Sequence, residues 1–288
     1  MSAQPLRAPP RDEVSAYYDA KTERLLHRYG PGPRVHYHTG MVEEIPPPGL
    51  TVEALRVRIH EAQERLLKEM ALAVGGWQVG REVLDVGCGL GGGSLYWAAE
   101  HKARVTAITI APAHLPWVRR FAEQAGVAHQ VTALLCDALE VPGRECFDLV
   151  VAVESSCYLP RREWFRKLRT LLRPGGRVLL TDCFLGRPAM AAPFDRYWRT
   201  RIGAVDEYFR AASEEGLRLE LHQDLTWRAV NFWTLTLDLL AREREAKLRQ
   251  GGLGLVGRSQ SEREHLRLQQ GFLDGGLHHG WMVLRRPR

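Results

Sequence analysis

The chain has 288 residues, of which 45% are hydrophobic and 26% are charged. These values are typical of a globular protein that can bury a core without disulfides or metals. Its 40 Lys and Arg against 34 Asp and Glu give a net charge of +6, spread along the chain as scattered arginines. We therefore expect no nucleic-acid partner. The lack of a long apolar run, or of an apolar N-terminal segment, argues against a membrane span and a signal peptide.

Cysteine usage favours a reducing compartment. Most of the cysteines lie in apolar runs, where this residue behaves as a small buried hydrophobe. Their number is odd and none forms a C-x-x-C pair: Cys88, Cys136, Cys146, Cys157 and Cys183. We expect no disulfide framework, no zinc site and a cytoplasmic protein.

The first quarter of the chain is predicted to be helical. Residues 1–10 are proline-rich and are expected to be disordered. Residues 11–29 predict one capped amphipathic helix, and Thr51 to Val74 predicts another, which Thr51 caps and Gly75 ends. A loop rich in histidine and tyrosine lies between them. We expect residues 11–75 to form a helical cap.

From residue 82 onward, short apolar strands alternate with helices. Strands are expected at 82–86, 104–109, 131–136, 147–153 and 177–182, with helices from about 92, at 112–125 and at 162–172, and a turn at 174–176. The rest of the chain is expected to contain a helix at 204–215, a strand at 218–224, helices at 229–250 and 260–273, and a strand at 280–285. A flexible glycine break at 251–254 separates the last two helices. This alternation predicts βαβ units, and hence an α/β fold with a doubly wound parallel sheet.

A glycine loop carries the strongest chemical signal. The run from Asp85 to Gly92 follows a strand and opens a helix. Glycines there let a ligand approach the backbone closely, and the helix N-terminus offers free N–H groups. Gly87, Gly89 and Gly92 satisfy the dinucleotide pattern G-x-G-x-x-G in form, but Asp85 two residues earlier makes it a poor fit. A purely structural turn is the alternative.

The D-x-G-x-G run resembles motif I of class I S-adenosylmethionine-dependent methyltransferases. The placement of Asp137, of the 147–151 strand and of the 172–177 turn agrees with this family. The resemblance implies a Rossmann-like fold with a seven-stranded sheet whose last strand is antiparallel, in a domain of residues 76–288 with cap insertions near 186–215 and 228–275. It implies S-adenosylmethionine as the cofactor, bound by Asp85, Gly87, Cys88, Gly89, Thr109, Ile110, Asp137, Ala138 and Tyr18.

One segment narrows the resemblance to enzymes that methylate carbon. Many members end the second strand with an acid that binds ribose, but this chain has Ala107-Ile108-Thr109-Ile110-Ala111. The run resembles the G-I-T-L-S version of sterol and cyclopropane-forming methyltransferases. By that resemblance, Thr109 and Ile110 contact the ribose through backbone and hydroxyl.

Three segments, at residues 36–40, 154–158 and 224–233, together with the C-terminal aromatic strand, resemble those of geranyl diphosphate 2-C-methyltransferase. That family methylates the alkene of a prenyl diphosphate. This similarity implies Glu154 as the base that deprotonates a carbocation and Trp198 as the aromatic face over it. The family has a tyrosine after its histidine triplet where Thr39 stands here, so Tyr37 is the substitute candidate. It implies Mg²⁺ bound to the diphosphate, and a substrate site made of Arg34, His36, His38, Tyr158, Phe232 and Trp233.

The sequence leaves several alternatives open. For the histidines the alternative is plain polar surface, and for the aromatic residues it is plain core, since such residues more often have these roles. For the reaction the alternative is methylation of O, N or C of another hydrophobic product, sterol-like or aromatic. A catalytically silent cofactor-binding scaffold is the alternative from another class. The oligomeric state is open, with a homo-oligomer allowed.

Overall fold

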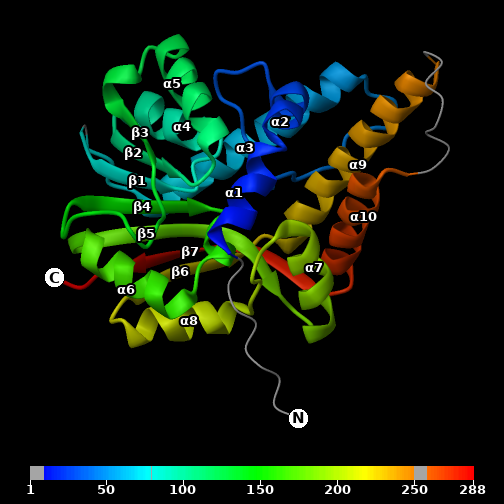
Figure 1. Cartoon of the computed structure of the whole chain (residues 1–288). Helices are drawn as coiled ribbons and strands as arrows, with labels where there is room; N and C mark the ends of the chain where they lie inside the picture. Colours follow the sequence, from blue (N-terminus) through cyan, green and yellow to red (C-terminus); the bar gives the residue numbers. More distant parts are fainter. Residues whose placement is uncertain (1–9, 79, 250–257) are drawn as a thin grey trace.

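The computed structural model describes residues 10–78, 80–249 and 258–288. At its centre is a seven-stranded sheet with the strand order β3-β2-β1-β4-β5-β7-β6 (Figure 1). The strands are β1 (Glu82–Val86), β2 (Arg104–Thr109), β3 (Val131–Leu135), β4 (Phe147–Val153), β5 (Leu172–Leu185), β6 (Arg218–Asp224) and β7 (Leu277–Arg285). β7 runs antiparallel to both β5 and β6, whereas the pairs from β3 to β5 are parallel. The predicted sheet and its antiparallel last strand are confirmed.

The central strands are buried on both faces because helices cover each side. Val83 and its neighbours on one face pack with α3 (Val52–Val74), α4 (Gly92–His101) and α5 (Leu115–Gln124). Leu84 and its neighbours on the other face pack with α6 (Arg161–Leu171) and α8 (Val205–Glu214). Parallel strands between two helical layers read as continuous apolar runs, which explains the pattern in the sequence.

A separate helical cap stands at one end of the sheet. It consists of α7 (Ala191–Trp198), α9 (Thr226–Arg249), α10 (Gln260–Leu273) and the first half of α3, at the right in Figure 1. Its core contains Phe232, Leu239, Leu268 and Phe272, and it reaches Cys183 on β5. The cap therefore lies beside the carboxyl end of β5.

The N-terminal helix differs from its prediction. Residues 11–29 form two helices, α1 (Arg11–Asp19) and α2 (Thr22–Tyr29), and Pro10 provides no side-chain cap. The Thr22 hydroxyl donates to the Tyr18 carbonyl at 3.0 Å, while the Lys21 N–H donates to the same carbonyl at 3.1 Å. Such local bonds compete with the regular helical pattern and tighten the chain into a turn. Thr51 does cap α3, as predicted, accepting from the Ala54 N–H at 3.2 Å.

The predicted turn at 174–176 is part of a strand in the structure. The 174–176 turn lies within the extended β5, where the Gly175 N–H donates to the Arg286 carbonyl at 3.0 Å. The disorder expected before residue 10 and the glycine break at 251–254 fall outside the described residues.

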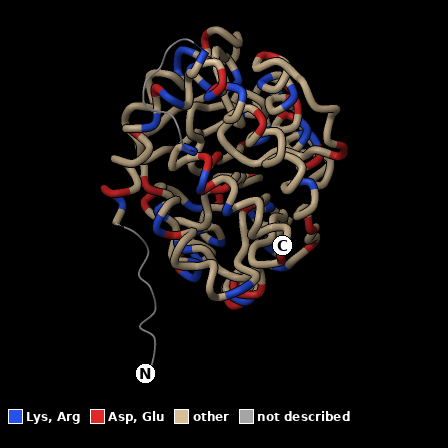
Figure 2. The backbone as a smooth tube through the Cα atoms, turned by 90° about the vertical axis from the view of Figure 1, so that its right-hand side faces the viewer, with Lys and Arg blue, Asp and Glu red and all other residues tan. Residues whose placement is uncertain are grey.

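Charge is dispersed over the face of the molecule that Figure 2 shows. Short blue Lys and Arg segments and red Asp and Glu segments are scattered along a mostly tan tube, without one basic stripe. Within the described ranges, no helix is long and apolar enough to cross a membrane.

Candidate active site

A cavity opens at the carboxyl ends of β1, β2 and β4. It measures about 240 Å³ and is roofed by α1 and the 35–38 loop. In an open α/β sheet this edge is where ligands bind. All the residues predicted to bind a cofactor line it: Asp85, Gly87, Cys88, Gly89, Thr109, Ile110, Asp137, Ala138 and Tyr18. We call it the cofactor cavity.

The glycine loop shapes one wall of the cofactor cavity. Gly87 and Gly89 have φ of +69° and +53°, in the left-handed region that favours glycine. A Cβ on Gly87 would lie 2.6 Å from Ser155 Cβ, whereas a Cβ on Gly89 would meet no atom within 4 Å. Gly87 is therefore needed for packing, while the space beside Gly89 belongs to the cavity. This wall suits close approach by a ligand such as S-adenosylmethionine.

The loop leads into the N-terminus of α4, whose cap Gly91 offers no side-chain hydrogen bond. The first N–H groups of α4 are thus not satisfied by a capping side chain. Next to them, Asp85 Oδ2 accepts a hydrogen bond from Ser94 Oγ at 2.5 Å. Burial raises the pKa of Asp85 to about 6, against the opposing effect of Ser94. The start of this helix, which has no capping side chain, and a buried carboxylate form a polar patch that fits a zwitterionic ligand.

The substitution Gly89→Val is expected to abolish cofactor binding while the protein stays folded. A valine side chain would project into the open space of the cavity. Gly126→Val is the matched control, because Gly126 also has positive φ (+70°) and open space but does not line this cavity. Calorimetric titration with S-adenosylmethionine, with melting temperatures for both variants, checks this. Unchanged affinity in the Gly89 variant would refute the assignment of the loop.

Helix α1 is fastened over the cofactor cavity by polar contacts. Ser15 Oγ donates to the Ile110 carbonyl at 2.8 Å, and Asp19 accepts from the Ala113 N–H at 3.0 Å. Tyr18 and Tyr158 share a hydrogen bond of 2.5 Å between their hydroxyls. The α1 helix thereby brings Tyr18 to the boundary between the cofactor cavity and a second cavity, which is described next.

A second, narrower cavity of about 50 Å³ lies between the cofactor cavity and the cap. We call it the substrate cavity. Five residues line both cavities: Tyr18, Tyr37, His38, Glu154 and Tyr158. The rest of its wall is largely aromatic and sulfur-containing: Tyr29, Phe194, Trp198, Phe232, Trp233, Cys157 and Cys183, with Thr39, Asp182, Thr200 and Leu268. The predicted pair Phe232 and Trp233 is therefore at this wall.

Glu154 stands where the two cavities meet. It follows β4 with φ of +49°, an uncommon conformation for a residue with a side chain. Its Oε1 accepts hydrogen bonds from the Thr39 N–H at 2.9 Å and from His279 Nε2 at 3.0 Å. No hydrogen bond to Oε2 occurs within the described part of the chain, so this oxygen is available to a ligand.

The surroundings of Glu154 keep it ionised. Burial alone would raise the pKa of this carboxyl, but the hydrogen bond and charge of His279, with help from His38 and the Thr39 amide, lower it below its usual value. Burial keeps the pKa of Tyr37 well above its usual value. At neutral pH, Glu154 is therefore a carboxylate and Tyr37 a neutral phenol, so Glu154 is the better base.

The predicted anion-binding loop is placed differently. Arg34 lines neither cavity, because its guanidinium binds Glu64 at 2.9 Å and also Glu100. His36 reaches the cofactor cavity but its Nε2 lies 2.6 Å from Glu64 Oε1. His38 lines both cavities, and burial, aided by His36, lowers its pKa to about 4. The loop therefore offers neutral His38 but no cation to the substrate cavity.

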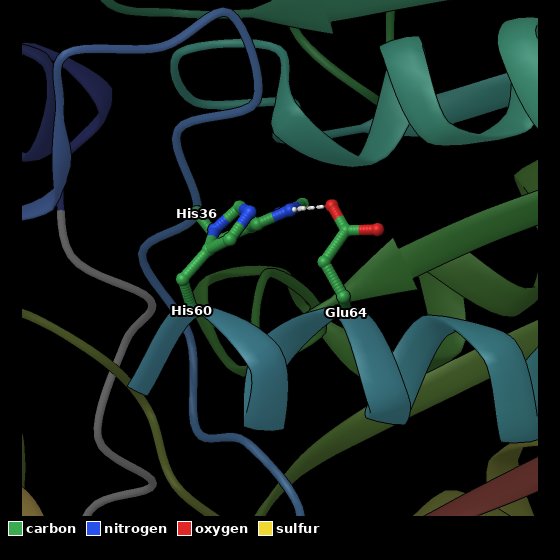
Figure 3. A group of neighbouring side chains, drawn as sticks. All are labelled: His36, His60 and Glu64. Carbon is green, nitrogen blue, oxygen red and sulfur yellow. Dashed lines mark hydrogen bonds and ion pairs between the residues drawn. The ribbon is translucent and has the colours of Figure 1, made fainter. Parts of the chain in front are cut away.

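Two groups of side chains have ligand atoms within 4.8 Å of one another, as a shared metal ion would require. In the first, His36 points toward Glu64, and His60 lies beside it on α3 (Figure 3). The second is Glu154, Cys183 and His279, at the substrate cavity. Neither is the all-oxygen set that Mg²⁺ prefers. Among the described residues, Mg²⁺ therefore has no ready-made site of this kind.

Two functional candidates were missed in the sequence. His279 lies on β7 next to Glu154, and Asp182 near the end of β5 lines the substrate cavity. Asp182 accepts from the Cys157 and Cys183 N–H groups, each at 2.9 Å, and burial together with the charge of Glu154 raises its pKa to about 7. The position of Asp182 at a strand end was a usable signal, whereas His279 had none.

Comparison with known proteins agrees with this geometry. A family model described as a methyltransferase domain matches residues 83–176. The 27-O-demethylrifamycin SV methyltransferase of Amycolatopsis mediterranei is 30% identical over 251 residues, which cover 83% of this chain and 86% of that protein. The geranyl diphosphate 2-C-methyltransferase of Streptomyces lasalocidi is 27% identical over 62% of this chain and 60% of that protein. Three matched proteins that are named as O-methyltransferases are covered over only 41%, 42% and 57% of their length.

The fold has close counterparts among solved structures. Geranyl diphosphate C-methyltransferase from Streptomyces coelicolor, in complex with Mg²⁺, geranyl diphosphate and S-adenosyl-L-homocysteine, superposes with a TM-score of 0.76. That match covers 98% of this chain and all of the other, at 19% identity. It establishes the Rossmann-like class I methyltransferase fold. With the glycine loop, the cofactor cavity and the relative from Amycolatopsis, it leads to the conclusion that this chain belongs to the S-adenosylmethionine-dependent methyltransferases.

Proposed function

We propose that this enzyme transfers a methyl group to an alkene carbon of an isoprenoid diphosphate. The observation that carries the proposal is the position of Glu154. Glu154 lies at the junction of the cofactor cavity and the aromatic-walled substrate cavity. Its Oε2 accepts no hydrogen bond from the described residues, whereas Oε1 accepts two. A base next to aromatic faces is what methylation of an alkene needs, because the reaction creates a carbocation.

The chemistry divides between cofactor and chain. S-adenosylmethionine supplies an electrophilic methyl on a sulfonium. The alkene π electrons form the new carbon–carbon bond as the sulfur–methyl bond breaks, which leaves a tertiary cation on the substrate. Trp198 and the neighbouring rings stabilise this cation by cation–π attraction. Glu154 Oε2 then removes a proton from the adjacent carbon, and the C–H electrons form the new double bond.

The architecture around these residues supports a water-poor site. Tyr18, Tyr37 and Tyr158 line the boundary between the two cavities, and burial raises the pKa of Tyr18 well above its usual value, so that it is a neutral phenol. Excluding water protects a carbocation from capture. The substrate cavity is also narrow, with space for only a few water molecules at about 50 Å³. Binding of an isoprenoid chain therefore requires the cap side chains to move apart.

Similarity supports the choice of substrate class. The Streptomyces lasalocidi relative is named as a geranyl diphosphate 2-C-methyltransferase, and the Streptomyces coelicolor structure contains geranyl diphosphate. The test is incubation with labelled methyl donor, Mg²⁺ and C5, C10, C15 and C20 prenyl diphosphates, with products read by mass spectrometry. A mass gain of one methylene unit on one diphosphate is expected; no gain on any of them would contradict the proposal.

Mg²⁺ is proposed to enter with the diphosphate. A diphosphate carries charge that must be neutralised beside an apolar cavity, and phosphate oxygens with water can complete an octahedral Mg²⁺ shell. We expect turnover on the diphosphate to be lost in chelator and restored by added Mg²⁺, as measured by methyl incorporation. Full turnover in chelator would argue for a substrate without phosphate.

A second candidate is methylation of a hydroxyl on another hydrophobic natural product. The relative from Amycolatopsis mediterranei, which is matched over 86% of its length, is named as a methyltransferase of 27-O-demethylrifamycin SV. The pair of Glu154 and His279 could remove a hydroxyl proton as well as a carbon-bound one. The two candidates separate in one assay, because O-methylation of a prenyl alcohol or a phenol needs neither a diphosphate nor Mg²⁺.

A further inference from the structure

We propose that a basic groove outside the substrate cavity binds the phosphoryl head of an amphipathic substrate. The basic groove is the depression of about 910 Å³ between α2, α7, α9 and α10, lined by Lys21, Arg24, Arg28, Arg196, Arg199, Lys247 and Arg267 among others. The proposal rests on the proposed function for the apolar tail of the substrate. It moves the anion site away from the Arg34 loop to which the sequence pointed.

The first argument is charge. Only two acids, Glu243 and Glu264, line the groove with these seven Lys and Arg side chains. Glu243 pairs with Arg28 at 3.1 Å, and Glu264 pairs with Arg267 at 2.7 Å. Lys21, Arg24, Arg196 and Arg199 form no ion pair within the described ranges. A concave surface with this excess of cations attracts a polyanion, and arginine forks match phosphate oxygens.

The second argument is the environment of Lys21, which is more than a surface lysine. Its Nζ donates to the Tyr17 hydroxyl and lies 3.8 Å from the Tyr17 ring centroid, with the Tyr197 and Trp198 centroids at 5.3 and 5.4 Å. Burial, followed by the charges of Arg24 and Arg28, lowers the pKa of Lys21 to about 7. A bound phosphate would supply the counter-charge that this ammonium lacks among the described side chains.

The third argument is that the groove and the substrate cavity lie on either side of one helix, α7. Helix α7 lines both, with Phe194 and Trp198 at the cavity and Arg196 and Tyr197 at the groove. The ring of Trp198 therefore has the cavity beside it and Lys21 Nζ within 5.4 Å. No Lys or Arg lines the described wall of the substrate cavity itself. An apolar tail in the cavity and an anionic head in the groove place each part of one ligand in a matching environment.

The opposing interpretation is that these arginines simply solvate the surface, as scattered charge often does. Paired surface arginines fit that interpretation, as Arg34 shows with its two glutamates. The groove differs because Lys21, one of its lining cations, is largely buried and has no carboxylate partner among the described residues. Since free phosphate, nucleotides and prenyl diphosphates share one chemistry, the experiment must distinguish them.

The test is calorimetric titration of the full chain, loaded with S-adenosyl-L-homocysteine, with pyrophosphate, geranyl diphosphate, ATP and geraniol. The variants are Lys21→Met, which keeps the apolar stem, and Arg24→Ala combined with Arg199→Ala. Arg119→Ala on α5 is the control, because Arg119 is exposed and outside the groove. We expect pyrophosphate and geranyl diphosphate to bind roughly tenfold or more weakly to both groove variants, as loss of charge-assisted hydrogen bonds predicts.

The possible results test phosphate binding in the groove separately from the proposed methylation reaction. Equal affinity of pyrophosphate and geranyl diphosphate for wild type, groove variants and control would overturn the groove. Tighter groove-dependent binding of ATP than of geranyl diphosphate would overturn the assignment to an amphipathic substrate. Groove-dependent binding of geranyl diphosphate, with no methylation of any prenyl diphosphate in the turnover assay above, would leave the groove standing and refute the proposed reaction. A melting temperature for each variant shows that lost affinity is not lost folding.

Discussion

Glu154→Gln is expected to lower turnover on the best prenyl diphosphate by roughly 10²–10⁴-fold while S-adenosylmethionine still binds. Glutamine keeps the size of the side chain and can still accept from the Thr39 amide and His279, which are 2.9 and 3.0 Å from Oε1. It removes the charge and the basicity. A negative charge beside a carbocation is worth far more in a site that excludes water than in bulk solvent. Steady-state rates and calorimetric cofactor affinity together check this.

Two companion variants make the result specific to Glu154. Glu154→Asp should retain a fraction of activity, since the carboxylate remains but its stem is one methylene shorter. Asp182→Asn tests the other buried acid of the substrate cavity, whose pKa is about 7. Near-normal turnover of Glu154→Gln would make Glu154 a bystander. If Asp182→Asn were then inactive, the base would be Asp182; otherwise Tyr37 is the next candidate.

His279→Leu is expected to move the acid limb of the kcat–pH profile to higher pH. His279 is the main group that counters the effect of burial on the Glu154 carboxyl, so its removal lets burial raise that pKa. Glu154 acts as a base only when ionised. Turnover should therefore fall more at pH 6 than at pH 8, and the loss should partly reverse as the pH rises.

The control lies one residue away. His278 is exposed on the same strand and sits 3.9 Å from Asp224, outside both cavities. His278→Leu should leave the profile unchanged. His279→Gln keeps a hydrogen-bond donor and should restore much of the activity at low pH. A uniform loss at every pH, unaffected by glutamine, would show that His279 only supports packing.

Part of the site could be predicted because the fold class dictates it. In a parallel sheet, residues that follow the strands meet at one edge, so the glycine loop, Asp137 and Glu154 were each placed by their strand. The structure brings all of them to the cofactor cavity. The roles assigned to them individually remain predictions.

Other features depended on contacts between distant parts of the chain. Arg34 was predicted to bind the substrate, but the direction of its side chain is set by ion pairs with Glu64 on α3 and Glu100 on α4. His279 lies 125 residues after Glu154, and a histidine in an apolar strand gives no signal of its partner. The bend after Asp19, which directs Lys21 toward Tyr197 and Trp198, comes from local hydrogen bonds that periodicity does not report. The direction of side chains in loops and at helix ends could therefore not be predicted from the sequence.

The way in which α1 is attached affects how the cofactor reaches and leaves its cavity. This helix roofs the cofactor cavity, yet Val14 is its one fully buried residue, and Ser15, Tyr18 and Asp19 hold it mainly by hydrogen bonds. Segments with little buried apolar area open at low free-energy cost, long before the rest of the domain unfolds. If spent cofactor leaves on this side, α1 has to detach and return in each cycle. Exchange of S-adenosyl-L-homocysteine for fresh cofactor is then expected to follow opening of this helix rather than unfolding of the domain, as lid motion controls access in many enzymes.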